Sequence, residues 1–390
     1  QMVNEVAGRG YENFARRSKQ IRRIGVVAVH DVQHNGFCSR APTSSSPKCH
    51  VAVGLSAVAE PTANSRPHLC LVDHSYHKTT ASNRFLLDLL GRGAELTVLH
   101  DQHWNGGPPV TARAINAVNA DAVVFFQIRP QRALLARLRC RNLTWVPMRD
   151  DISTRSKRWQ KLRPFGLKII SFSGEIEELA EAAGLACLRL RYYPPALKLI
   201  PSRGPAPTVL WWYRHADISL PLVESLIGEQ TIAELIIRHA PDPGQPVLHL
   251  PKDAYRRWPI REVHGWLEPE KYRELVEPAT HVIAPRLIEG IGLPVLEAMA
   301  RGQCVIAANR PTMNEYITHE DTGLLYEPET PKQIELAAGA GCGQRAHEQV
   351  TQGHARWQSE SSDILPFILQ RIERRNPLVA IHRLRNDIRD

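Results

Sequence analysis

The sequence has no long run of apolar residues. No stretch of about 18 uncharged apolar residues occurs in its 390 residues, so we expect no transmembrane helix. The first residues, QMVNEVAGRGYENFARRSKQIRR, are basic, but no apolar segment follows them as it does in a secretory signal peptide. These features predict a cytoplasmic protein.

Cysteine is also scarce. The seven cysteines lie far apart, and none forms a CxxC pair. An odd, scattered set of this kind fits reduced thiols in a cytosolic protein and argues against a structural zinc site. The chain also shows no P-loop, no Ser-His-Asp set and no evident cluster of metal ligands. We therefore expect neither a bound metal nor a resident cofactor.

Acidic residues are few in one segment. Lys and Arg outnumber Asp and Glu by 49 to 40 over the whole chain, and Arg129 to Lys168 alone holds twelve basic residues against two acidic ones. Such a segment attracts anionic lipid headgroups or lipid-linked diphosphates, which predicts peripheral binding at the inner face of the cytoplasmic membrane. The alternative is a solvated arginine-rich surface. A nucleic-acid partner is not expected, because no aromatic interleaving accompanies the charge.

Hydrophobic residues make up 43% of the chain and charged residues 23%, the balance of a globular protein. From residue 67 onward, short Val, Ile and Leu runs without polar alternation, such as DAVVFFQI, LKIISFS and QCVIAAN, alternate with helical periods. Unbroken apolar runs are typical of parallel strands that helices cover on both faces. The sequence predicts an α/β protein with doubly wound parallel sheets.

The length fits two domains of roughly 150 residues plus extensions. Residues 200–208, IPSRGPAPT, combine three prolines and a glycine, as an interdomain hinge does. The expected organisation is an N-terminal segment of uncertain structure (1–66), a first Rossmann-like domain (67–200), a hinge (201–207), a second Rossmann-like domain (208–356) and C-terminal helices that pack back across the hinge (357–390).

The segment from Thr280 to Glu327 carries the functional argument. A buried strand ends in a glycine-bearing loop, and a helix is predicted to begin near Pro294. The amides and the positive dipole of a helix start attract phosphate, and Gly290 and Gly292 allow the backbone close approach. Glu289 and Glu297, with seven residues between them, place two carboxylates near this start. A carboxylate accepts hydrogen bonds from two adjacent hydroxyls, as a ribose or a hexose offers.

The residues EGIGLPVLEAMARG, followed by NRPTMNE and TGLLYEP, resemble the donor-site segment of retaining glycosyltransferases of family four, which have the GT-B fold and an E(x7)E motif. The resemblance covers the second domain and implies that this is the donor domain and that the first is the acceptor-side domain. It implies that Glu289 binds hydroxyls of the transferred sugar and that Glu297 binds the ribose. It also implies that the amides at Gly292 and Leu293 receive the diphosphate, and that Glu315 corresponds to a further donor-site glutamate.

The same resemblance implies that Arg214 neutralises the leaving diphosphate and that Gly265 contacts the base. Trp266 either joins that contact or belongs to the core. The family's usual lysine about five residues after the arginine is missing, so another cation, such as Arg256 or Arg257, is needed in its place. Asp150 matches the aspartate of the family's His-Asp pair. It either faces the sugar or acceptor or caps a helix that starts near Ser153.

The resemblance, together with the basic segment, implies a retaining, hexosyltransferase-like enzyme that uses a nucleotide-diphosphate sugar as co-substrate and a glycan or lipid-linked acceptor, in bacterial envelope polysaccharide or lipopolysaccharide synthesis. Retention with the leaving phosphate as base requires no protein nucleophile, only positioning and charge stabilisation. Two alternatives stay open. One is a non-catalytic GT-B-like subunit that binds a glycan or a partner, and the other is a nucleotide-sugar epimerase.

Overall fold

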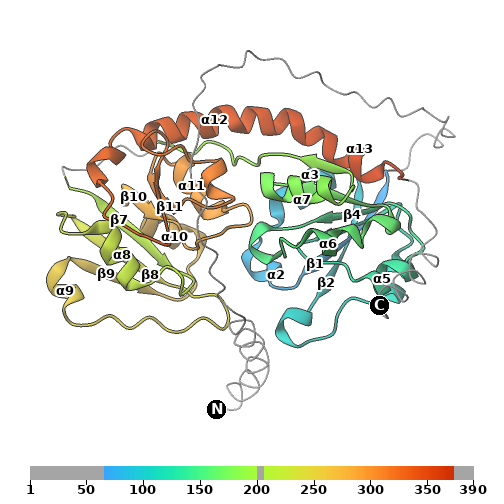
Figure 1. Ribbon diagram of the computed structural model, residues 1–390, viewed down its shortest axis with the longest axis horizontal. Coiled ribbons are helices and arrows are strands. Elements are labelled where there is room, and N and C mark those ends of the chain that lie inside the picture. The colour runs from blue at the N-terminus through green and yellow to red at the C-terminus, as the bar shows by residue number, and fades with distance from the viewer. Residues whose placement is uncertain (1–65, 200–205, 373–390) are drawn as a thin grey trace, which may run out of the picture. The chain divides into compact units, whose positions relative to one another are not determined.

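The computed structural model describes residues 66–199 and 206–372. The expected N-terminal segment apart from Arg66, most of the expected hinge and the end of the tail lie outside the described residues. Within them there are two six-stranded sheets, and all the recorded strand pairs are parallel. None of the described helices combines the length and apolar character needed to cross a bilayer. The predicted α/β class with two doubly wound sheets is confirmed (Figure 1).

The first sheet has the strand order β2-β1-β3-β4-β5-β6. Its strands are β1 (His68–His74), β2 (Glu95–Asp101), β3 (Ala122–Phe126), β4 (Leu143–Val146), β5 (Leu167–Ser171) and β6 (Cys187–Arg189). The helices of this part are α2 (His77–Thr80), α3 (Arg84–Gly93), α4 (Ala112–Val118), α5 (Arg132–Arg137), α6 (Ser156–Gln160) and α7 (Gly174–Ala182).

The second sheet has the order β12-β11-β10-β7-β8-β9, which is the strand order of the Rossmann fold. Its strands are β7 (Thr208–Tyr213), β8 (Glu234–His239), β9 (Ile260–His264), β10 (His281–Ile283), β11 (Cys304–Ala308) and β12 (Leu324–Tyr326). The helices are α8 (Leu220–Ile227), α9 (Ala254–Arg257), α10 (Pro269–Val276), α11 (Leu293–Ala300), α12 (Cys342–Glu360) and α13 (Ile364–Leu369).

Helices cover both faces of each sheet because successive strand residues point to opposite sides. In β1, Leu69 and Leu71 pack in one cluster with Leu86 and Leu90 of α3. Cys70 and Val72 point the other way, into a second cluster that includes residues of α4 to α7. The strands β3 and β5 are buried along their whole length, as their unbroken apolar sequences predict.

One apolar stretch expected to continue the alternation forms no strand. The residues QPVLHL (245–250) lie in the connection between β8 and α9 and include Val247, which is 69% exposed. Four prolines between positions 241 and 251 remove backbone donors that a sheet ladder needs, and so favour a loop.

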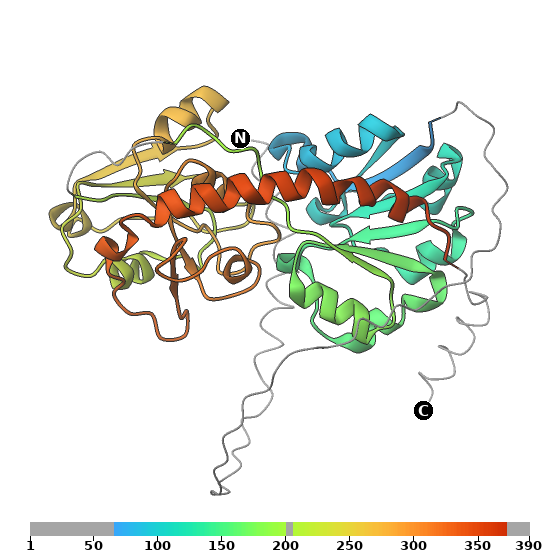
Figure 2. The same ribbon diagram turned by 90° about the horizontal axis from the view of Figure 1, so that it is seen from above.

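The long helix α12, red in Figures 1 and 2, begins at Cys342, ahead of residue 357 where the sequence predicts the tail to begin. Trp357 of α12 lies against aromatic rings that follow strands of the first sheet, with ring centroids 5.2 Å from Tyr192 and 6.2 Å from Phe172. Gly353 leaves room for the Tyr193 ring, into which a Cβ would intrude. The helix α12, which follows the second sheet in the chain, thereby packs against residues that follow strands of the first sheet.

Candidate functional site

The second sheet reverses its strand order between β7 and β10, and ligands of open α/β sheets bind outside the carboxyl ends of strands at such a point. Arg214 directly follows β7, Asp242 follows its neighbour β8, and Arg286 follows β10. Adjacent strands thus bring to one edge three side chains that lie far apart in the sequence.

These three side chains form a continuous ionic network. Arg214 Nε donates to Asp242 Oδ1 at 2.9 Å, and Arg286 Nη2 donates to Asp242 Oδ2. Arg286 Nη1 also donates to Asp150 Oδ2 at 2.7 Å. Two guanidinium groups therefore lie side by side and share one carboxylate.

The network fixes the charge of its members. Burial favours the neutral form of Asp242, but Arg214 and Arg286 outweigh it and lower the pKa of this carboxyl below its usual value. Burial likewise opposes the charge of Arg286, but Asp242, Glu289 and Asp150 raise its pKa. The Arg286 guanidinium is therefore charged, and Asp242 holds both guanidinium groups in place.

Glu289 lies beside this network in the loop between β10 and α11. The residue is only 4% exposed, and its Oε1 atom has no hydrogen-bond partner. Burial raises the pKa of Glu289 to about 7, although Arg214 and Arg286 act in the opposite direction. A buried carboxyl with an unsatisfied oxygen is costly unless a ligand completes its hydrogen bonds.

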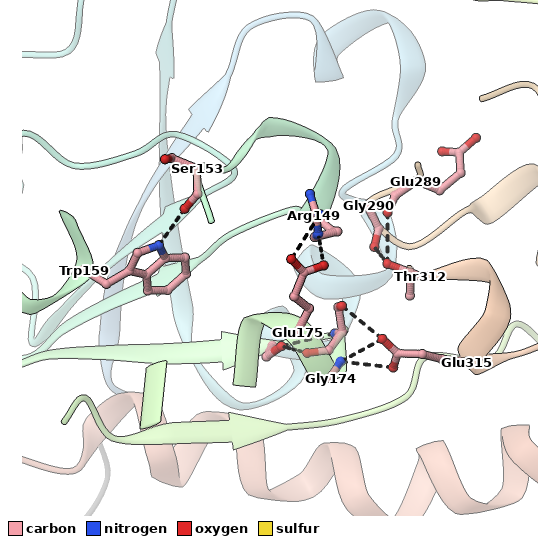
Figure 3. Close-up of polar contacts among 11 residues, drawn as sticks. Arg149, Ser153, Trp159, Gly174, Glu175, Glu289, Gly290, Thr312 and Glu315 are labelled. Carbon is pink, nitrogen blue, oxygen red and sulfur yellow. Dashed lines mark hydrogen bonds and ion pairs between the residues drawn. The ribbon is translucent and has the colours of Figure 1, made fainter. Parts of the chain in front are cut away.

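The backbone of this loop is held from the next loop of the sheet. The Thr312 hydroxyl donates to the carbonyl of Glu289 at 2.9 Å and to that of Gly290 at 3.0 Å. Figure 3 shows these two bonds and the Glu289 carboxylate directed away from Thr312. The carboxylate is thus free of the contacts that fix its own backbone.

Both predicted glycines are required by close packing. A Cβ on Gly290 would lie 3.0 Å from Asp150 Oδ1, and Gly292 has a φ of +77°, with the Met313 side chain where its Cβ would be. Gly292 precedes α11, so Leu293 supplies the first amide of a helix whose initial N–H groups have no helical partner.

Asp150 contacts this loop from the first-sheet part of the chain. It lies in the 3₁₀ turn Arg149–Asp151 after β4, and its carboxylate accepts from Arg286. The alternative prediction is that Asp150 caps the next helix. This helix, α6, begins at Ser156 and has no side-chain cap. The capping alternative is therefore wrong.

The other predicted donor residues lie around the same sheet edge. Glu297 is on α11, and Arg301 one turn later is 3.4 Å from it. Gly265 follows β9 with a φ of +82° and donates its amide to the His239 carbonyl. Trp266 is 57% exposed, so the alternative that it belongs to the core is wrong. Arg238, buried on β8, lies over the Trp212 ring at 4.1 Å and within 5.8 Å of the Trp266 ring.

Glu315 does not lie beside Glu289 with the other acidic groups. Its carboxylate accepts from the Gly174 amide at 2.8 Å (Figure 3). It also accepts from the Ser173 hydroxyl at 3.0 Å and pairs with Arg189 at 2.6 Å. It therefore occupies the N-terminus of α7, where a negative charge is favourable.

The cations considered in place of the missing lysine have other partners. Arg256 is exposed and pairs with Asp253, and Arg257 bonds the Gly228 carbonyl and Glu229. Arg286 is the guanidinium that shares a carboxylate with Arg214. No sequence motif points to Arg286, because only strand order makes the residues after β10 and β7 neighbours.

The basic segment contains two members that do not contribute to a charged surface. Lys168 is 1% exposed, and its Nζ donates to the carbonyls of Phe367 and Ile368 near the end of α13. Arg149 is bonded to Glu175. The remaining exposed members include Arg137, Arg139 and Arg141.

At the corresponding edge of the first sheet, His77 Nδ1 lies 2.7 Å from the carboxylate of Asp73, which is fully buried. Burial raises the pKa of Tyr76. The charges of Asp242, Arg214 and Arg286 also act on this pKa, which indicates that Tyr76 lies near the guanidinium network. The sequence offered no spacing rule for this histidine–aspartate pair.

Residues 260–338 match the family model described as "Glycosyl transferases group 1". The matched segment runs from β9 to the 3₁₀ turn before α12. This match supports glycosyl transfer. A search of curated proteins found no match.

Solved structures resemble the fold at low sequence identity. Sucrose-phosphate synthase from Thermosynechococcus elongatus aligns with a TM-score of 0.55 and 13% identity over 77% of this chain and 98% of its own. The Anabaena protein Alr3699/HepE in complex with UDP-glucose aligns with a TM-score of 0.50 and 13% identity over 77% and 99%. TarM aligns with a TM-score of 0.49 and 13% identity over 66% of this chain, which spans only 57% of TarM. The fold is GT-B, as the sequence predicts.

Proposed function

We propose that this chain is a retaining glycosyltransferase whose nucleotide-sugar donor binds at the carboxyl ends of β7, β8 and β10. The observation that carries the proposal is the pair of guanidinium groups, Arg214 and Arg286, held by Asp242 beside the unsatisfied carboxyl of Glu289. The loop holding Glu289 and Arg286 lies inside the segment that matches the glycosyl transferase model. Two fixed cations suit a diphosphate, and a carboxyl suits the hydroxyls of a sugar.

The roles in donor binding are assigned as follows. Arg214 and Arg286 bind the diphosphate and stabilise the charge that develops on it as the glycosidic bond breaks. The amide of Leu293 at the start of α11 adds to this, with Gly290 and Gly292 allowing the approach. Arg286 thereby supplies the second cation that the family pattern takes from a lysine.

Glu289 accepts hydrogen bonds from hydroxyl groups of the transferred sugar, and Glu297 accepts hydrogen bonds from those of the ribose. Gly265, with the exposed Trp266 beside it, contacts the base. Asp150 holds Arg286 from the first-sheet side, so it positions the diphosphate site. Glu315 is assigned a supporting role, because its carboxylate is already occupied by the start of α7.

For the acceptor we propose a glycan or a lipid-linked glycan, in bacterial envelope polysaccharide or lipopolysaccharide synthesis. The exposed part of the basic segment, which excludes Lys168 and Arg149, supports binding of an anionic membrane surface. Substitution of Arg137, Arg139 and Arg141 by Gln should reduce binding to vesicles containing anionic lipid. Unchanged binding would remove the membrane from the proposal.

The test of the donor site is a thermal-shift series with UDP, GDP, dTDP, CDP and ADP. UDP is of first interest because the Anabaena protein of the same fold is described with UDP-glucose. One nucleotide should raise the melting temperature of the wild type, with about 2.7 kcal/mol of stabilisation at 100 times its Kd, and the shift should shrink in Glu297→Ala. If no nucleotide gives a shift, the donor-site assignment is wrong.

Retention is tested separately with the matching sugar nucleotide, by following the anomeric configuration of the product by NMR. In the proposed retaining mechanism the leaving phosphate takes the proton of the attacking acceptor hydroxyl. No protein nucleophile is then required. An inverted product would point to His77, oriented by Asp73, as a general base instead.

One observation favours a non-catalytic binding subunit as a second candidate. The charges of Arg214 and Arg286 are already offset by Asp242 and Asp150, which leaves little net positive charge for a diphosphate. The absence of a thermal shift with all five nucleotides, for a folded wild type, would support that candidate. An epimerase would instead convert the sugar nucleotide without an acceptor.

A further inference from the structure

Three potential metal ligands lie together at the carboxyl ends of two neighbouring strands. His239 ends β8, and Glu262 and His264 are on β9. Glu262 and His264 are two residues apart and so project from the same face of the strand. The register pairs His239 with His264, so all three residues meet at one point of the sheet.

The donor atoms are close enough to coordinate one ion. His239 Nε2 lies 2.8 Å from Glu262 Oε2, and His264 Nε2 lies 3.9 Å from the same oxygen. All three ligand atoms lie within 4.8 Å of one another. In a tetrahedral zinc site, ligands at about 2.0–2.2 Å from the metal stand roughly 3.4 Å apart. The two separations from Glu262 differ from this value by about half an ångström, and the separation of the two imidazoles differs from it by at most about 1.4 Å.

We propose that His239, Glu262 and His264 bind one Zn²⁺ ion, with the fourth coordination position open to solvent. The sequence predicts no metal site, because these ligands come from two strands and show no usual spacing. Two imidazoles and one carboxylate form a ligand set that suits Zn²⁺.

The surroundings of the three side chains support metal binding. His239 is buried, and its ring centroid lies 4.2 Å from that of His264. The Tyr255 hydroxyl donates to the second oxygen of Glu262. Such an outer hydrogen bond orients a ligating carboxylate. His264 is 69% exposed and has the freedom to turn its ring toward the ion.

A bound ion would tie the edge strand β9 to β8 immediately before Gly265. The Gly265 amide already donates to the His239 carbonyl at 2.9 Å. The metal would therefore fix the start of the loop Gly265–Trp266. Any effect on nucleotide binding rests on the proposed function, whereas metal binding itself does not.

The test is a zinc titration of the full chain, purified without a polyhistidine tag, stripped with a chelator and kept reduced. Competition with a chromophoric zinc chelator should show one high-affinity equivalent per chain. Glu262→Gln and His264→Ala should each weaken it at least tenfold. His319→Ala is the control, because His319 is also exposed and lies beside a glutamate, Glu320, but belongs to no group of three metal ligands among the described residues.

Substitution with Co²⁺ identifies the ligands independently of activity. The spectrum should lack the charge-transfer band of a thiolate ligand and should be lost in His264→Ala, an exposed position where misfolding is not expected. Failure of the wild type to bind one equivalent, or binding by both variants as tight as wild type, would overturn the proposal. Zinc binding with no nucleotide shift would leave the metal site in place and reject only the donor site.

Discussion

Glu289 is a buried acid whose protonation should affect folding. Its pKa is about 7 in the folded protein against the usual 4.5, so the folded state binds this proton more tightly than the unfolded chain. A group of this kind contributes stability that is fully present below pH 4.5 and is lost as the pH rises through 7.

We expect the wild type to lose about 3 kcal/mol more unfolding free energy than Glu289→Gln between pH 4.5 and 8. Urea unfolding at both pH values measures this difference. Glu274→Gln, at an exposed site paired with Lys271, should keep the wild-type pH dependence. If Glu289→Gln also keeps it, Glu289 does not titrate as the structure indicates.

Arg286 is the residue that the sequence missed at the proposed diphosphate site. Arg286→Gln should lower kcat/KM for the donor by about 10²–10³, because a fixed charge is lost where negative charge develops. The kcat/KM of Arg286→Lys should fall between those of the wild type and Arg286→Gln. Lysine keeps the charge, but an ammonium does not bridge Asp242 and Asp150 as a planar guanidinium does.

Arg256→Gln is the matched control for this change. Arg256 is exposed and pairs with Asp253 three residues earlier, so its loss should leave donor kinetics within about twofold. Circular dichroism and a melting curve show whether Arg286→Gln is folded. A folded Arg286→Gln with wild-type kinetics would remove Arg286 from the mechanism.

At the scale of elements, the turn from β10 into α11 depends on Gly292. Gly292→Ala places a side chain at positive φ and against Met313. Gly106→Ala is a matched control, because Gly106 has a similar φ of +80° and nothing within 4 Å of the added Cβ.

Gly106→Ala should cost about 1–2 kcal/mol for the left-handed conformation alone. Gly292→Ala should lower the unfolding free energy by about 1–3 kcal/mol more than Gly106→Ala, because the added methyl group overpacks against Met313. It should also reduce the nucleotide-induced thermal shift. Equal losses in the two variants, measured by urea unfolding, would mean that the contact with Met313 relaxes at no cost.

At the scale of the whole molecule, a buried lysine of the first sheet forms hydrogen bonds with the end of α13. Lys168 Nζ donates to the carbonyls of Phe367, Ile368 and Gln370, at 2.7, 2.6 and 2.5 Å. These carbonyls are at and just after the end of α13, where a cation is favourable.

Lys168→Met keeps the apolar stem but leaves these carbonyls without their donor, so we expect a loss of at least about 2 kcal/mol in unfolding free energy. Lys271→Met, at an exposed lysine on α10, should change stability by less than about 0.5 kcal/mol. Similar values for the two variants would show that α13 does not depend on Lys168.

The sequence by itself determined the α/β class, the two doubly wound sheets and the glycine-bearing loop before α11. These features depend on local patterns, because unbroken apolar runs mark buried parallel strands and a glycine–proline pair marks a helix start. The segment around Glu289 and Glu297 was recognisable for the same reason, since its chemistry lies within one short stretch of chain.

Only the tertiary structure decided which charges meet. Strand order places Arg286 and Asp242 beside Arg214, helix packing buries Lys168, and the start of α7 takes up the carboxylate of Glu315. Short motifs describe neighbours along the chain, whereas ion pairs form between any residues that the sheet order brings within about 4 Å. The pairing of distant charges therefore follows from topology.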